Sequence, residues 1–231
     1  MGKCKGVIRI KDRMNKNKKI LLRLAAVLVY GIFYLAGFAW VEQRYVTGVH
    51  IMTLPIDYKI PFLEIFIIPY ALWFGYIAVA LAYFLMHEEE DFDSLAQFLV
   101  FGMTLFLLIS AIYPNGLNLR PKTFERDNIF VDMVKILYAN DTPTNVLPSI
   151  HVYNSVAIFI AVKRSKLAEK NRAWAWGSGI LSFLIILSTM FLKQHSVFDV
   201  VSALALSLCA ERLCYRVHIP LKRRKLHKQW I

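Results

Sequence analysis

The sequence is poor in cysteine. Its 231 residues include three cysteines: Cys4 lies in a basic N-terminal segment, and Cys209 and Cys214 lie in the last apolar run. This is not the even, regularly spaced set that defines a small disulfide-stabilised secreted domain. We therefore expect free thiols that behave as small apolar side chains.

Several targeting and binding signals are also missing. No small-residue cleavage site follows the first apolar run, so we expect this run to be retained as an anchor and not removed as a signal peptide. Gly6 stands where a myristoylation motif needs Ser or Thr. The net charge is +12, but no basic groove or recognition motif accompanies it, which argues against nucleic acid as a partner.

Charge is scarce over long stretches of the chain. Hydrophobic residues make up 57% of the sequence, against about 45–50% in a typical soluble domain, and the mean hydropathy is +0.46. The excess is concentrated in six apolar runs, which predicts an all-α polytopic membrane protein with six transmembrane helices in a bundle. The runs cover approximately residues 20–40, 62–86, 95–113, 151–162, 173–192 and 197–217.

The distribution of Lys and Arg predicts the orientation of these spans. We expect a membrane domain at 20–217 between two basic tails, 1–19 and 218–231. The N-terminal tail, the 163–172 loop and the chain from Arg216 carry nineteen Lys and Arg residues, against seven in the three opposite loops. Because basic loops stay in the cytoplasm, both termini are predicted to be cytoplasmic.

Two loops have patterns of their own. Phe130, Met133, Val134 and Leu137 follow helical spacing, which predicts an amphipathic helix at about 127–138 lying on the membrane surface. The acidic turn at 87–93 superficially resembles a metal site, but adjacent carboxylates in a tight turn more often stay hydrated, and we expect no metal there.

Polar residues that are far apart in the sequence are predicted to share the outer face. On a helix Asp199 lies on the same side as His195, four residues earlier, where a carboxylate fixes the imidazole tautomer and leaves the other nitrogen free to attack. His151 is placed to protonate a leaving oxygen. Arg120 offers a planar fork for phosphate oxygens, and Lys193 adds a compact positive charge. Each residue alone has an ordinary structural interpretation, but their coincidence favours a site.

Ser149 completes this set at the start of the fourth run. Its hydroxyl and the neighbouring backbone N–H groups are suited to binding phosphate at a helix N-terminus. Together these groups are the parts of a phosphoryl transfer through phosphohistidine that needs no metal.

The same residues resemble a known family. Leu119-Arg120-Pro121, Pro148-Ser149-Ile150-His151 and Ser188 with His195 and Asp199 are similar to the three signature motifs of the PAP2 (type 2 phosphatidic acid phosphatase) superfamily. The resemblance implies a helical bundle and metal-independent catalysis. It also implies a set of roles: His195 as nucleophile, Asp199 as its orienting partner, His151 as general acid, and Arg120 and Ser149 as phosphate ligands.

The sequence departs from the family pattern at three positions. Tyr113 stands where the family has Lys, Ile150 where it usually has Gly, and Thr189 where it usually has Arg. Two cationic phosphate ligands are therefore missing. Lys193, Lys122 and Arg126 are the candidates to compensate, and we expect Lys193 first because it lies two residues from His195.

These observations predict an enzyme that hydrolyses a lipid phosphate or diphosphate, of the phosphatidic acid, phosphatidylglycerol phosphate or isoprenoid diphosphate type. Its partners are the lipid substrate and the membrane lipids, with the site on the outer face of a bacterial cell membrane. The departures leave open a lipid phosphotransferase like the sphingomyelin and inositol-phosphorylceramide synthases, which resemble the superfamily. A third alternative is an inactive membrane scaffold.

Overall fold

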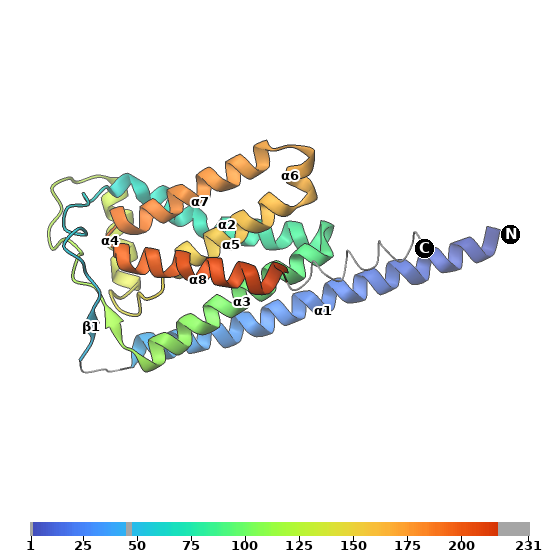
Figure 1. Ribbon diagram of the computed structural model, residues 1–231, viewed down its shortest axis with the longest axis horizontal. Helices are drawn as coiled ribbons and strands as arrows, with labels where there is room; N and C mark the ends of the chain where they lie inside the picture. Colours follow the sequence, from blue (N-terminus) through green and yellow to red (C-terminus); the bar gives the residue numbers. More distant parts are fainter. Residues whose placement is uncertain (1, 45–47, 217–231) are drawn as a thin grey trace.

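The structure, a computed structural model, is an assembly of helices that run nearly side by side (Figure 1). It describes residues 2–44 and 48–216, with side chains from residue 17 onward. The elements are α1 (Gly2–Gln43), β1 (His50–Ile51), the 3-10 helix η1 (Glu64–Phe66), α2 (Ile67–His87), α3 (Glu89–Ile112), β2 (Asn115–Gly116), α4 (Ile129–Asn140), α5 (Ile150–Arg164), α6 (Lys166–Lys170), α7 (Ala173–Phe191) and α8 (Val197–Arg216).

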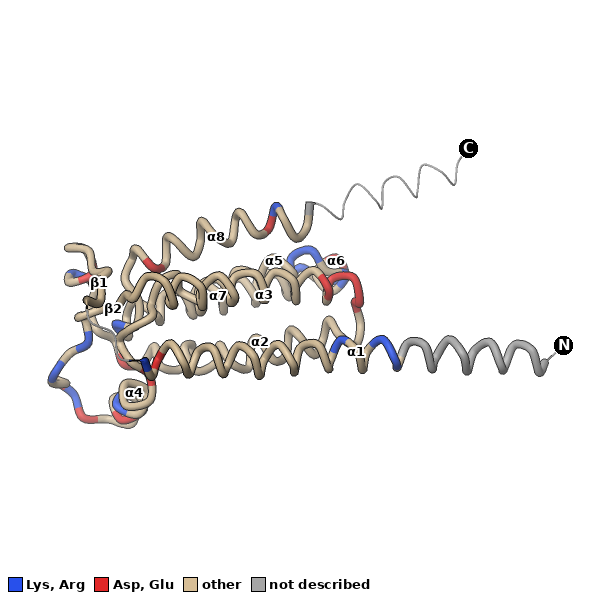
Figure 2. The backbone as a smooth tube through the Cα atoms, turned by 90° about the horizontal axis from the view of Figure 1, so that it is seen from below, with Lys and Arg blue, Asp and Glu red and all other residues tan. Residues whose placement is uncertain are grey.

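Four segments of the described chain are long and apolar enough to cross a membrane: Asn17–Gln43, Glu64–His87, Glu89–Ile112 and Ala173–Phe191. Charged residues are concentrated at the two ends of the bundle, and the stretches between them carry few (Figure 2). Apolar helices of this length fit an integral membrane protein. The predicted count of six spans stays a prediction, because α5 and α8 are not among the four.

Helix α5 is short and is enclosed by other helices. Its 15 residues extend about 22 Å at 1.5 Å per residue, less than the roughly 30 Å hydrocarbon core of a bilayer. It packs against α2, α3, α7 and α8, and buried side chains occur all along it, from Val152 to Ala161. A helix covered in this way by its neighbours can carry polar residues such as Asn154 and Ser155, both buried, without presenting them to lipid.

The main core lies where α5 meets α3. Tyr153 is 1% exposed, and its hydroxyl donates to the carbonyl oxygen of Phe98 at 2.8 Å. This ring lies against Gly102 so closely that a β-carbon added there would approach its Cε1 to 2.0 Å. The close approach of α3 and α5 therefore depends on a residue without a side chain at position 102.

One end of the bundle is held by an ion-pair cluster. The guanidinium of Arg23 on α1 donates to Asp93 at 2.6 and 2.7 Å and to Glu89 at 2.8 Å. The acidic turn that superficially resembled a metal site thus supplies carboxylates that join α1 to α3. At the N-terminus, α1 begins at Gly2, so most of the segment predicted as a tail, 1–19, is helical and continuous with the first apolar run. The predicted C-terminal tail, 218–231, lies outside the described residues.

The other end of the bundle is covered by irregular chain and by α4 (Figure 1). Strands β1 and β2 pair in parallel, His50 with Asn115 and Ile51 with Gly116, and so connect the two long loops. The helix predicted at about 127–138 is α4, which is capped by the side chain of Asn128. Val131 and Val134 are its buried residues. Its position on a membrane surface stays a prediction.

Substitution of Gly102 is expected to separate α3 from α5. Gly102→Ala places a methyl group inside the Tyr153 ring contact and should lower the free energy of unfolding by about 1–3 kcal/mol. Gly75→Ala on α2 is the matched control, because nothing lies within 4 Å of its added β-carbon. Thermal unfolding in detergent compares the two. Equal midpoints for Gly102→Ala and Gly75→Ala would contradict the predicted contact.

Candidate active site

His151 lies in the first turn of α5, against two aromatic rings of α2. Its ring centroid is 4.6 Å from that of Tyr70 and 4.2 Å from that of Trp73. The hydroxyl of Ser149 caps the helix by accepting from the N–H of Val152 at 3.4 Å. The cap and the aromatic contacts together fix the direction in which the imidazole leaves α5.

His195 lies in the tight turn between α7 and α8, just before a helix cap. Ser196 and Asp199 cap each other: the Asp199 N–H donates to the Ser196 hydroxyl at 3.2 Å, and the Asp199 carboxylate accepts from the Ser196 N–H at 2.8 Å. This is the reciprocal arrangement of a capping box. The same oxygen, Oδ2, lies 3.5 Å from Nδ1 of His195. One buried carboxylate therefore starts α8 and faces the imidazole.

The two predicted histidines meet. Their ring centroids are 5.7 Å apart, and the backbone N–H of Ser149 donates to the Asp199 carbonyl oxygen at 3.4 Å, which joins α5 to α8. Both rings line one small pocket that is open to the surface. Its wall also includes Gln194, Glu42 of α1 and part of the segment from Asp141 to Val146. One phosphoryl group placed in this pocket is close enough to contact both imidazoles.

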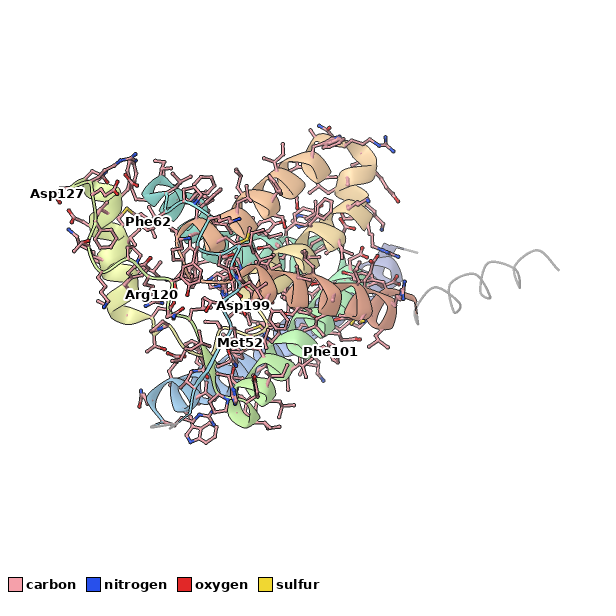
Figure 3. The ribbon with its side chains drawn as sticks, turned by 60° about the vertical axis from the view of Figure 1, so that its left-hand side comes forward. Met52, Phe62, Phe101, Arg120, Asp127 and Asp199 are labelled. Atoms are coloured by element: carbon pink, nitrogen blue, oxygen red, sulfur yellow. The ribbon has the colours of Figure 1, made fainter. Side chains whose placement is uncertain are left out.

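Arg120 lies beside this pocket, between α4 and the beginning of α8 (Figure 3). Its guanidinium donates to the carbonyl oxygens of Asp141 at 2.6 Å and Thr142 at 3.1 Å, and to Oε1 of Gln194 at 2.6 Å. It also lies 4.5 Å from the centroid of the Tyr138 ring. Burial lowers the pKa of Arg120 and raises that of Asp141, and their mutual attraction opposes both shifts.

Lys193 has different partners from those we expected. Its ammonium donates to the carbonyl oxygens of Asp57, at 2.8 Å, and Ile60, and burial lowers its pKa. The carboxylate of Asp57 in turn accepts from the N–H of Val197 at 2.8 Å. In this geometry Lys193 fastens the loop at 54–60 to the turn that carries His195. The expected replacement of a missing phosphate ligand therefore does not fit the contacts of its ammonium.

Several polar atoms around the pocket are buried and have no hydrogen-bond partner among the described residues. They include Nδ1 of His151, Nδ1 of His195, Oδ1 of Asp199, Nε of Arg120 and Nε2 of Gln194. Buried polar atoms without partners are costly and are often found at functional sites. No group of three or more His, Cys, Asp or Glu residues suited to holding a metal occurs in the described part of the chain.

The sequence was compared with family models, curated proteins and solved structures. The model of the PAP2 superfamily matches residues 95–223, more than half of the chain. The chain belongs to the PAP2 superfamily. Members of the PAP2 superfamily are generally phosphatases, which suggests phosphatase-type activity for this chain. Neither the search of curated proteins nor the search of solved structures returned a match.

The PAP2 match includes every residue predicted for the site and excludes α1 and α2. Yet α2 supplies Tyr70 and Trp73, which hold His151, and α1 supplies Glu42. The sequence interpretation missed these residues and Gln194. Position was the only available signal for Gln194, since it directly precedes His195.

Substitution of Asp199 tests its two contacts separately. Asp199→Asn keeps an oxygen for the Ser196 N–H but loses the negative charge that faces His195. We expect turnover to fall on the order of 10²–10⁴-fold, with a small change in thermal midpoint. Asp199→Ala should lose both turnover and stability, because the cap is lost as well. The exposed Asp132→Asn on α4 is the control, and full activity in Asp199→Asn would rule out the orienting contact.

Proposed function

We propose that this protein hydrolyses a lipid phosphate or diphosphate without a metal, through a phosphohistidine intermediate. The observation that carries the proposal is the meeting of His151 and His195 in one pocket with the Asp199 carboxylate beside His195. Membership of the PAP2 superfamily supports phosphatase-type chemistry independently of this geometry.

In the first step Nε2 of His195 attacks the phosphorus atom. A phosphorus–nitrogen bond forms while the bond to the leaving lipid oxygen breaks, and His151 gives that oxygen a proton. The carboxylate of Asp199 stabilises the positive charge that develops on the His195 ring. At 3.5 Å the contact from Nδ1 to Oδ2 is longer than a good hydrogen bond, and contacts of this kind commonly shorten when substrate binds.

In the second step water attacks the phosphorus atom of the phosphohistidine. His151, now neutral, accepts a proton from the water, the phosphorus–nitrogen bond breaks, and orthophosphate leaves. The aromatic contacts of His151 with Tyr70 and Trp73 support its role in both steps, because they hold the ring in one position beside the pocket.

A second candidate is a lipid phosphotransferase, in which a lipid hydroxyl replaces water in the second step. The neutral residues at two cationic positions of the family favour it. The hydroxyl of Thr189 is bonded to the carbonyl oxygen of Ile186 at 2.8 Å, and the ring of Tyr113 stacks on that of His50. A singly charged phosphodiester headgroup needs fewer cations than a doubly charged monoester. An inactive scaffold is the third candidate, and no observation favours it.

We also propose six spans, with both termini in the cytoplasm and the site on the outer face of a bacterial membrane. The basic 163–172 loop and the pocket lie at opposite ends of α5, which supports placing them on opposite sides. The region 20–217 would then form the membrane domain, and α4 would lie at the outer surface.

Removal of the nucleophile should abolish activity. Purified protein in detergent is expected to release orthophosphate from short-chain phosphatidic acid or an isoprenoid diphosphate in the presence of EDTA. His195→Ala should reduce the release to background, and the wild-type protein should show an acid-labile, alkali-stable phosphoryl group when quenched during turnover. Equal activity in wild type and His195→Ala would exclude the mechanism.

Isotope-labelled water distinguishes hydrolysis from transfer. Hydrolysis puts one labelled oxygen into each released orthophosphate. If a lipid acceptor gains the headgroup and no label enters phosphate, the protein is the transferase. If neither product forms with any lipid phosphate tested, the scaffold is favoured.

Cysteine labelling tests the orientation. In a chain whose three native cysteines are replaced by alanine, Glu125→Cys and Lys170→Cys place single thiols at exposed positions of opposite ends. A membrane-impermeant maleimide should label Glu125→Cys in intact cells, and Lys170→Cys only after permeabilisation. The reverse pattern would overturn the orientation and place the pocket at the cytoplasmic face.

A further inference from the structure

Gln194 is a buried residue of the pocket to which neither the motifs nor the proposed mechanism gives a role. It is 4% exposed and lies in the turn between α7 and α8, directly before His195. The backbone N–H groups of Gln194 and His195 both donate to the carbonyl oxygen of Thr189, at 2.9 and 3.0 Å. The backbone of Gln194 is therefore held together with that of His195, and its side chain lines the pocket with both histidines.

The orientation of the Gln194 amide is determined by Arg120. A guanidinium has only donors, so the amide atom that it contacts at 2.6 Å has to be the oxygen. The amide NH₂ group must then point away from Arg120. This nitrogen is buried and has no hydrogen-bond partner in the described part of the chain. A pair of N–H donors thus remains unsatisfied beside the two histidines.

No Lys or Arg side chain among the described residues lines the pocket to donate hydrogen bonds to phosphate oxygens. Thr189 stands in place of an arginine, and the Lys193 ammonium is bound to the carbonyl oxygens of Asp57 and Ile60. The terminal nitrogens of Arg120 contact backbone carbonyl oxygens, the Asp141 carboxylate and Gln194. Its Nε has no partner in the part of the chain that the structure describes, but Arg120 is not among the residues that line the pocket. Phosphate oxygens in this pocket still require donors, because a buried anion without them is strongly destabilised.

We propose that the side-chain amide of Gln194 is a ligand of the transferring phosphoryl group. It donates an N–H to a phosphoryl oxygen, while Arg120 holds the amide oxygen and draws electron density from it. That polarisation makes the NH₂ group a stronger donor. Arg120 thereby acts on the phosphate through a neutral residue. The inference rests on the proposed phosphoryl transfer, for which it supplies the missing oxyanion donor.

The alternative is that Gln194 only holds Arg120 in place, and one substitution separates the two roles. Gln194→Glu keeps an acceptor for Arg120 at the same position but replaces the NH₂ donor with a second oxygen. A positioning residue would tolerate this change, whereas a phosphate ligand would not, because a carboxylate repels the phosphoryl oxygens. Gln194→Met has a similar length and removes both the acceptor and the donor.

Turnover and phosphate binding are measured separately, so that this inference and the proposed function can fail independently. We expect kcat/KM for lipid phosphate to fall about 10²-fold or more in Gln194→Glu. In detergent, millimolar orthophosphate should raise the thermal midpoint of the wild-type protein by binding to the folded state. Both Gln194 variants should lose that shift, each compared with its own midpoint without phosphate. Gln43→Glu, at the exposed C-terminal end of α1, is the control and should behave like the wild type.

The outcomes are distinct. An unchanged phosphate shift in either folded Gln194 variant overturns the proposal, and so does wild-type turnover in Gln194→Glu. Absence of any phosphate shift in the wild type overturns it as well. If Gln194→Glu does not fold, the shift in Gln194→Met decides. A phosphate shift that depends on Gln194, in a protein that releases no phosphate from any lipid, would support the ligand and contradict the proposed hydrolysis.

Discussion

The buried carboxylate of Asp199 is the constraint on which the rest of the site depends. It is fully buried, and one of its oxygens both caps α8 and faces His195. A buried carboxylate needs hydrogen-bond donors, and Oδ2 has the Ser196 N–H while Oδ1 has no partner among the described residues. The backbone of the same residue accepts from Ser149 and so joins the start of α5 to that of α8. The positions of both histidines follow from this one residue and its neighbours.

The loops at the pocket end of the bundle contact the turn between α7 and α8, which carries His195. The ammonium of Lys193 and the carboxylate of Asp57 connect the 54–60 loop to the start of α8, and the hydroxyl of Tyr138 on α4 donates to the carbonyl oxygen of Leu192 at 2.7 Å. The charged groups that surround the site thus divide into two kinds. Some, such as Lys193, bind the protein's own backbone, and others, such as Asp199, face the histidines of the pocket. Sequence alone does not separate the two kinds, because both are polar residues near a histidine.

The charges around the pocket are unusual for the phosphoryl transfer that we propose. Glu42 and Asp141 line the pocket together with the histidines, and Arg120 stands behind Gln194. A neutral donor supported by a buried cation binds an anion less strongly than a cation in direct contact. A neutral donor also leaves less unpaired positive charge in the pocket before substrate binds, which lowers the free-energy cost of burying the site. In the proposed reaction, weaker binding of this kind would favour release of the phosphate product.

The sequence by itself determined the helical class, four of the apolar spans and the residues of the histidine pair with its carboxylate. These follow from local composition and from spacing along a helix, which the chain carries in every segment. The contacts of Lys193, Arg120 and Gln194 were decided only by the tertiary structure, as was the central burial of α5. Each depends on which distant backbone carbonyls, rings or helices surround a side chain, and no spacing along the chain encodes those neighbours.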